Sequence, residues 1–427
     1  MMRVAFYIKN GNFSSVDFSD VVNGNPGVGG SDNSHILIPT YLQKHHLLNC
    51  IILSEMPGLF DKSIENETVG DAEGALKYCI EHNEIDLIVF NANHVKTDIL
   101  KKYHLVKIVL WVHNFVRIKV LRQYEKLNNV LRVVNVGREL NDLYRDMPIF
   151  YKSTYIFNAF NLEAISSYQK EILPFELRPY HVVYIGSLIK TKGFHLLAKA
   201  WPDIKNAVPN AELFVIGGGN LYDKNAKLGK WGIADADYEN LFMPYLMTGQ
   251  EIRKDVHFLG ILGSEKYIVF KHCRVGVANP SGESETFGNG AVEMQLMGCN
   301  VTTIRCAGYL DSVYNKKNLY DNPKQLAGFV VRLLKKESDS HKDILKYISD
   351  NFSLRCIALQ WKNLLESDLS KSVVVERLKG SDTNFHNKLL KDWIRRYVPL
   401  SIRAYLIPIE WFYPSPLVKI GKMLMNC

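Results

Sequence analysis

Long apolar segments are missing from this chain of 427 residues. No run of about 18 apolar residues occurs in it, so the sequence predicts no helix that crosses a membrane. Paired cysteines are missing as well. The seven cysteines are scattered and form no Cys-x-x-Cys pair, which argues against a disulfide framework or a zinc site and favours a reducing cytosol. The apolar run near the start, Val4 to Ile8, is too short for an export segment, and we expect a cytoplasmic protein.

Composition and charge narrow the class of protein further. Hydrophobic residues make up 47% of the chain and aromatic residues 11%, which excludes a disordered chain. At roughly 150 residues per domain, the length predicts two or three domains. The net charge of +8 is uneven, because residues 371–427 hold ten Lys or Arg against four Asp or Glu. The first 370 residues therefore carry only about +2, and we expect no binding of nucleic acid.

Short, almost continuously apolar runs alternate with helical stretches along the first 160 residues. Such runs are typical of strands that are covered on both faces, and their alternation with helices predicts a parallel sheet in an α/β fold. Six strands are predicted here: Arg3–Ile8, Cys50–Glu55, Asp86–Asn91, Lys107–His113, Arg132–Val136 and Thr154–Phe157.

The same pattern restarts after a polar stretch that contains proline. Its five predicted strands are His181–Ser187, Glu212–Gly217, Val256–Gly260, Val275–Asn279 and Asn300–Ile304. We therefore expect a first domain at 1–165, a linker at 166–180, a second domain at 181–369 and an extension at 370–427. Two α/β units joined in this way usually bind a ligand in the cleft between them.

Two glycine-bearing turns are candidate anion sites. Gly27-Val28-Gly29-Gly30 precedes a predicted helix, where backbone N–H groups favour an anion, although a flexible surface loop stays open as an interpretation. Its glycines follow the strand by about 18 residues, which disfavours a nicotinamide dinucleotide site. In Gly186-Ser187-Leu188, followed by Lys192-Gly193, a lysine in a strand-to-helix turn is placed to meet phosphate oxygens, although this motif taken alone favours a solvated turn lysine.

The most specific pattern follows the predicted strand Val275–Asn279. Glu285 and Glu293 are separated by seven residues, with a glycine-bearing loop after the first and a predicted helix around the second. The loop can direct N–H groups at hydroxyls or a diphosphate, and the carboxylates can accept hydrogen bonds from sugar hydroxyls. Two acids at this spacing are common by chance, but their setting in a strand, a glycine loop and a helix is less so.

Several motifs in this order make residues 3–365 resemble the retaining glycosyltransferases of family four, which have the two-domain GT-B architecture. The family's Glu-x7-Glu motif after Pro-Ser is matched by Pro280-Ser281 and by Glu285 through Glu293. The remaining matches are Gly186-Ser187-Leu188 with Lys192-Gly193, the glycine loop at Gly29-Gly30, the histidine of Trp111-Val112-His113, and Ile156-Phe157-Asn158.

The resemblance implies a role for each matched residue. Glu285 would hold hydroxyls of the donor sugar beside Phe287 and Gly288, and Glu293 would bind the ribose of the nucleotide. The implied contacts to the diphosphate and the sugar come from Lys192, Gly29, Gly30, the turn at Ser187, and His113. No metal and no other cofactor is implied.

Two features do not fit the family pattern simply. Ser187 stands where the family has an arginine, so one of two implied diphosphate cations is missing, and Lys190 is the candidate substitute. Asp235-Ala236-Asp237 resembles the metal-binding Asp-x-Asp of another glycosyltransferase fold. It lies in a presumed insertion, where solvated acids are the more ordinary interpretation.

The function that the resemblance implies is retaining transfer of a sugar from a UDP- or GDP-sugar to a glycan or lipid-linked acceptor. The implied setting is synthesis of a surface polysaccharide such as a capsule, an LPS O-antigen or an exopolysaccharide. Two alternatives stay open: a sugar-nucleotide epimerase of the same fold, and a catalytically silent glycan-binding or scaffold protein.

The basic extension has an amphipathic pattern across 383–422. Its apolar residues recur at helical spacing: Phe385, Leu389, Leu390, Trp393, Ile394, Tyr397 and Val398. One interpretation is a segment that lies on anionic lipid and holds the protein peripherally on the inner face of the cell membrane. The other is a stripe that packs on the first domain.

Overall fold

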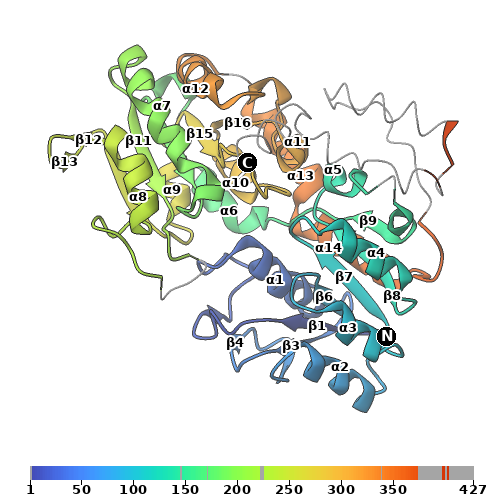
Figure 1. Ribbon diagram of the computed structural model, residues 1–427. Coiled ribbons are helices and arrows are strands. Elements are labelled where there is room, and N and C mark those ends of the chain that lie inside the picture. Colours follow the sequence, from blue (N-terminus) through green and yellow to red (C-terminus); the bar gives the residue numbers. More distant parts are fainter. Residues whose placement is uncertain are drawn as a thin grey trace.

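Two parallel sheets organise the computed structural model (Figure 1). The structure describes residues 2–144, 147–170, 172–221, 226–337, 339–373, 397–399 and 402. Most of the extension at 370–427, including nearly all of the predicted amphipathic segment, lies outside these residues. No helix within the described part of the chain is long and apolar enough to span a bilayer.

The first sheet has seven strands in the order β5-β3-β1-β6-β7-β8-β9, and every neighbouring pair is parallel. The strands are β1 (Arg3–Ile8), β3 (Asn49–Ser54), β5 (Glu65–Thr68), β6 (Leu87–Asn91), β7 (Ile108–Val112), β8 (Val130–Asn135) and β9 (Ser153–Tyr155). All six strands predicted in this region are confirmed to within two residues at either end. Their continuous apolar runs are buried between α1 (Gly30–Lys44), α2 (Ala72–Glu81), α3 (Thr97–Lys102), α4 (Ile118–Lys126) and the other helices around them.

The second sheet has six parallel strands in the order β14-β11-β10-β15-β16-β17. They are β10 (His181–Ile185), β11 (Glu212–Ile216), β14 (Val256–Gly260), β15 (Val275–Ala278), β16 (Asn300–Ile304) and β17 (Leu319–Tyr320). The helices between these strands and after β16 include α7 (Phe194–Ala207), α9 (Lys266–Phe270), α10 (Asn289–Leu296) and α11 (Ala307–Ser312). The five strands predicted here are also confirmed to within two residues.

After the second sheet, the chain returns to the first. The helix α14 (Leu354–Glu366) lies against the first sheet, beside β7, in Figure 1. The Trp361 ring is 4.5 Å from the Trp111 ring and 6.5 Å from the Phe6 ring, both centroid to centroid. The domain bounds at 165, 180 and 369 remain predictions. The range predicted for the second domain, 181–369, contains α14, although this helix packs on the first sheet.

The segment between the two sheets is partly helical. The helix α6 (Leu162–Gln169) begins at Asn161, whose side chain accepts hydrogen bonds from the N–H groups of Glu163 and Ala164. Residues 166–169, which the sequence predicts as linker, therefore belong to a capped helix. The Gln169 amide also donates to the Leu296 carbonyl at 2.9 Å, which ties this helix to the second unit.

Candidate functional site

A cleft of about 310 Å³ lies between the two sheets. Loops that follow β1, β7, β10 and β15 all contribute to its lining, so it forms where parallel strands end, as ligand sites in such sheets do. The nine residues singled out from the sequence all line it: Gly29, Gly30, His113, Ser187, Lys192, Glu285, Phe287, Gly288 and Glu293. The structure thus gathers them in one place, while the roles that the resemblance implies remain predictions.

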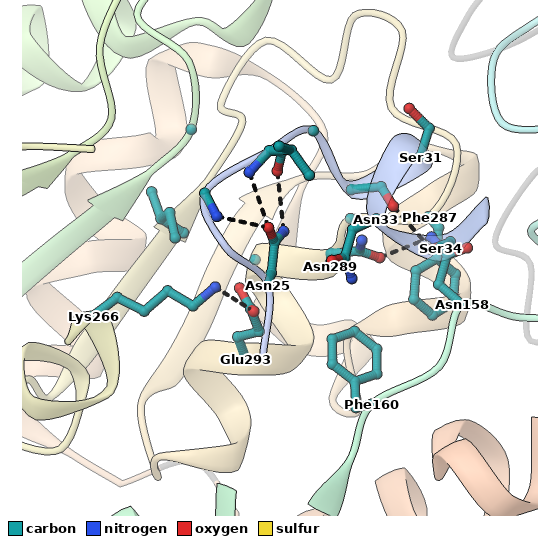
Figure 2. A pocket seen from close by; sticks show the side chains of 18 of the residues that line it. Asn25, Ser31, Asn33, Ser34, Asn158, Phe160, Lys266, Phe287, Asn289 and Glu293 are labelled. Atoms are coloured by element: carbon teal, nitrogen blue, oxygen red, sulfur yellow. Dashed lines mark hydrogen bonds and ion pairs between the residues drawn. The ribbon is translucent and has the colours of Figure 1, made fainter. Parts of the chain in front are cut away.

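The glycine loop before α1 is held by a single side chain. Asn25 Oδ1 accepts hydrogen bonds from the N–H groups of Gly27 and Val28, both at 2.9 Å, and its Nδ2 donates to the Val28 carbonyl (Figure 2). Gly27 has φ +93°, which favours glycine. This segment is therefore an ordered turn in the cleft wall. The turn leads into the N-terminus of α1 at Gly30, which lies close to Asn289 of the second domain.

Close contacts join the two units around this loop. A Cβ on Gly30 would lie 2.4 Å from Asn289 Nδ2, so any larger residue there would displace the Asn289 side chain. Asn158 Nδ2 donates to Asn289 Oδ1 at 2.8 Å across the cleft (Figure 2). The Thr286 hydroxyl donates to the His113 carbonyl at 2.5 Å. These contacts place the glycine loop and His113 directly against the loop that carries Glu285.

Glu285 is held by two donors from its own domain. Lys192 Nζ lies 3.1 Å from Glu285 Oε2, and Asn279 Nδ2 donates to the same oxygen at 3.1 Å. The side chains of Lys192 and Glu285 are 20% and 13% exposed, so the pair is only partly screened by solvent. Sequence reasoning did not assign a role to Asn279, which follows β15 directly.

The residues after Glu285 form the start of α10. Phe287 is buried between the rings of Phe157 and Phe352, with centroids 5.7 and 5.2 Å away. Gly288 has φ +84°, and a Cβ there would lie 2.4 Å from a ring carbon of Tyr309. The buried ring anchors the turn, and the left-handed glycine opens the N-terminus of α10 to the cleft, where its dipole favours an anion.

Glu293 lies one turn further along α10 and also pairs with a lysine. Lys266 Nζ is 2.6 Å from Glu293 Oε1 (Figure 2), and the Tyr267 hydroxyl donates to the same oxygen at 3.2 Å. Both donors come from α9. Sequence reasoning missed Lys266 and Tyr267, because nothing in their spacing distinguishes them from an ordinary short helix.

Ser187 does not provide a cation, and neither does Lys190. The Ser187 side chain is buried, and its hydroxyl donates to the Gly218 carbonyl at 3.3 Å. Lys190 is exposed and is not among the residues that line the cleft. Of the described lining residues, the cations are Lys192 and Lys266.

His113 belongs to a small cluster of buried imidazoles. Burial lowers the pKa of His113 to about 3, so the ring is neutral near pH 7. Its Nε2 has no hydrogen-bond partner among the described residues. The His35 ring lies 5.1 Å from it, and neither His35 nitrogen has a partner there either. Burial lowers the pKa of His35 well below its usual value, and His35 was missed from the sequence because it occupies an apolar face of α1.

The Asp235-Ala236-Asp237 segment has a local structural role. Asp235 is the N-cap of α8 (Ala236–Phe242), and its carboxylate accepts the N–H of Tyr238 at 3.0 Å. Neither aspartate lines the cleft. Within the described ranges, no group of three or more His, Cys, Asp or Glu residues is arranged to hold a metal ion. Metal independence remains a prediction.

Comparison with known protein families gives one match, which covers the second sheet and the helices around it. Residues 179–336 match the family model described as glycosyl transferases group 1. No curated protein sequence matches the chain.

Solved structures with the same fold are numerous but distant in sequence. Sucrose-phosphate synthase from Thermosynechococcus elongatus is 15% identical with a TM-score of 0.65, covering 86% of this chain and 98% of its own. A glycosyltransferase from Rickettsia africae ESF-5 is 14% identical with a TM-score of 0.61, covering 86% and 99%. HepE of Anabaena, solved in complex with UDP, is 17% identical with a TM-score of 0.59, again covering 86% and 99%. The chain therefore has the GT-B fold, with two Rossmann-like domains facing a cleft, and it is a glycosyltransferase that carries the group 1 domain.

Proposed function

We propose that the cleft transfers a sugar, with retention of anomeric configuration, from a UDP- or GDP-sugar to a glycan or lipid-linked acceptor. The observation that carries the proposal is the pairing of two carboxylates with two lysines in one cleft. Glu285 lies 3.1 Å from Lys192, and Glu293 lies 2.6 Å from Lys266. Carboxylates suit sugar and ribose hydroxyls, and lysine suits a diphosphate, so the set has the chemistry of a sugar nucleotide.

The reaction breaks the bond between the donor sugar and the diphosphate. Negative charge develops on the departing phosphate oxygen, and groups already oriented towards it lower the barrier. In this proposal Lys192 supplies the cation. The N-terminus of α10 at Gly288 and that of α1 at Gly29 and Gly30 supply backbone N–H groups.

The sugar is held on two sides in this proposal. On the side of the second domain, Glu285 accepts hydrogen bonds from the hydroxyls of the donor sugar. His113 contacts it from the first domain as a neutral imidazole, because burial keeps its pKa at about 3. A neutral ring can donate to a hydroxyl or accept from one without adding charge near the leaving group.

The nucleotide assignment has independent support from a structure with the same fold, since HepE of Anabaena was solved with UDP. We further propose family four as the family, surface polysaccharide synthesis as the setting, and transfer without a metal ion. Metal independence in this proposal means that Lys192 and the helix N-termini alone compensate the charge of the departing diphosphate.

The test is a transfer assay on the purified full chain with a panel of UDP- and GDP-sugars. Glycan and lipid acceptors are added separately, and release of nucleoside diphosphate is measured. We expect acceptor-dependent release from one donor, undiminished by EDTA and abolished in Glu285→Ala. Interconversion of the donor without any acceptor would instead reveal an epimerase. Unchanged transfer by a folded Glu285→Ala variant would refute the site assignment.

A further inference from the structure

Lys266 is a buried cation in the wall of the cleft. The residue is 7% exposed, and its ammonium lies 2.6 Å from Glu293 Oε1 (Figure 2). Among the described residues, Glu293 is its one acidic partner. A buried ammonium is tolerated when it is paired, so each of the two residues fixes the position of the other.

Tyr267 adds a second contact to the same carboxylate. Its hydroxyl donates to Glu293 Oε1 at 3.2 Å, and its ring packs 5.3 Å from the ring of Tyr168, centroid to centroid. Burial, followed by the nearby Glu293 carboxylate, raises the pKa of Tyr267 well above its usual range. The hydroxyl therefore keeps its proton and remains a donor.

The two donors leave the other carboxylate oxygen available. Lys266 and Tyr267 both contact Oε1, whereas Glu293 Oε2 receives no hydrogen bond from any described residue. The Glu293 side chain keeps 12% of its surface exposed, and it lines the cleft. One oxygen is thus fixed by the protein, and one can accept a hydrogen bond from a ligand.

This arrangement solves an electrostatic problem for a nucleotide site. A nucleoside diphosphate is an anion, so an unpaired carboxylate in the same cleft would repel it. The Lys266 ammonium neutralises Glu293 locally without occupying its free oxygen. Because the carboxylate is already held in one orientation, little conformational entropy is lost when a hydroxyl binds to it.

We propose that Lys266 and Tyr267 are positioning residues that hold Glu293 so that its free oxygen selects a ribose diol. The cleft would then prefer ribonucleoside diphosphates to their 2′,3′-dideoxy analogues. The inference rests on the proposed function, because it needs a nucleotide at Glu293. Beyond the proposed function, it names Lys266 and Tyr267 as the residues that make Glu293 selective for a ribose diol.

The experiment is calorimetric titration of the full chain with UDP, GDP and their 2′,3′-dideoxy analogues. For whichever base binds, we expect the wild type to prefer the ribonucleotide at least tenfold. In Lys266→Met the preference should fall to threefold or less, and Tyr267→Phe should lie between the two. Lys266→Arg retains the charge and should keep most of the preference.

A matched control comes from the same domain. Lys205 Nζ lies 3.5 Å from Asp255, and neither residue lines the cleft, so Lys205→Met should leave the preference unchanged. Thermal unfolding establishes that each variant is folded. If Lys266→Met does not fold, the comparison of Tyr267→Phe with the wild type decides the question.

The outcomes separate this inference from the proposed function. If a folded Lys266→Met variant kept the full preference for the ribonucleotide, the inference would be overturned and the nucleotide site would stand. If only Tyr267→Phe folds, a full preference in that variant has the same meaning. Failure of the wild type to bind either UDP or GDP would overturn the proposed function, and the inference with it.

Discussion

Lys192 Nζ lies 3.1 Å from Glu285 Oε2, so the lysine proposed for the diphosphate and the carboxylate proposed for the donor sugar neutralise each other. Asn279 donates to the same oxygen and fixes the carboxylate from the strand side. In the proposed complex a phosphate oxygen of the nucleotide sugar accepts a hydrogen bond from Lys192, and a sugar hydroxyl donates one to Glu285, so the nucleotide sugar takes over contacts that the two residues make with each other. Each partner therefore positions the other before the donor binds.

Removing the cation should slow transfer. In Lys192→Ala a charge-assisted contact to the diphosphate is lost, worth about 1.5–3 kcal/mol, so we expect kcat/KM to fall at least tenfold. The steady-state rate on the identified donor measures this. Lys190→Ala is the matched control, because Lys190 is exposed and outside the cleft lining. Equal rates for the wild type and Lys192→Ala would contradict the proposed role.

Glu293→Ala should weaken the fold as well as nucleotide binding. The substitution leaves the Lys266 ammonium buried without its acidic partner, which typically costs about 3–5 kcal/mol. Urea unfolding measures the loss. The double variant Glu293→Ala/Lys266→Met removes the orphaned charge and should recover part of the stability. An unfolding midpoint unchanged in the single variant would show that Lys266 finds another partner.

The pH dependence of stability should report a contact between the domains. The buried Asp311 carboxylate accepts the N–H of Glu139 at 2.9 Å and lies 3.4 Å from Arg138 Nε. Burial and the nearby Glu139 carboxylate together raise the pKa of Asp311 to about 7, although Arg138 opposes the shift. An unfolded aspartate titrates near pH ~4. The folded state therefore binds more protons between about pH 4 and 7, and the free energy of unfolding falls as the pH rises.

Asp311→Asn removes this titration while keeping an oxygen that can accept the Glu139 N–H. We expect the stability of the wild type, relative to the variant, to decrease from pH 5 to pH 8. Urea unfolding of both proteins at several pH values measures the difference. A difference that is constant across this range would mean that Asp311 titrates alike in the folded and unfolded states.

The extension is tested separately, because most of it lies outside the described residues. The Val373 N–H donates to the Tyr151 carbonyl at 2.8 Å, so a truncation after Val373 keeps this contact with the first domain. We expect the full chain to float with anionic vesicles at low salt and the truncated chain not to. Equal flotation of the two chains would assign the membrane affinity elsewhere, and flotation of neither would favour a structural role for the extension.

The strands of both sheets were predictable because a buried parallel strand has a continuous apolar run. Two of their strands were not predicted. The strand β5 has the sequence Glu-Asn-Glu-Thr, which is polar throughout and exposed at the sheet edge, and β17 has only two residues, too few for a recognisable run. Most of the cleft residues were predicted through the family resemblance, whose motifs follow strands or open helices in this sequence. Lys266 and Tyr267 were not, because their contact with Glu293 depends on how α9 packs on α10, which no local spacing encodes.

The most direct test of the central claim is whether the cleft binds a nucleoside diphosphate. Unfolding of the wild type is followed with UDP, GDP or ADP present, and a ligand at 100 times its Kd should stabilise the protein by about 2.7 kcal/mol. We predict that one of the three raises the unfolding midpoint and that Lys192→Ala reduces this shift. Absence of any shift with all three, at millimolar concentration, would contradict the account.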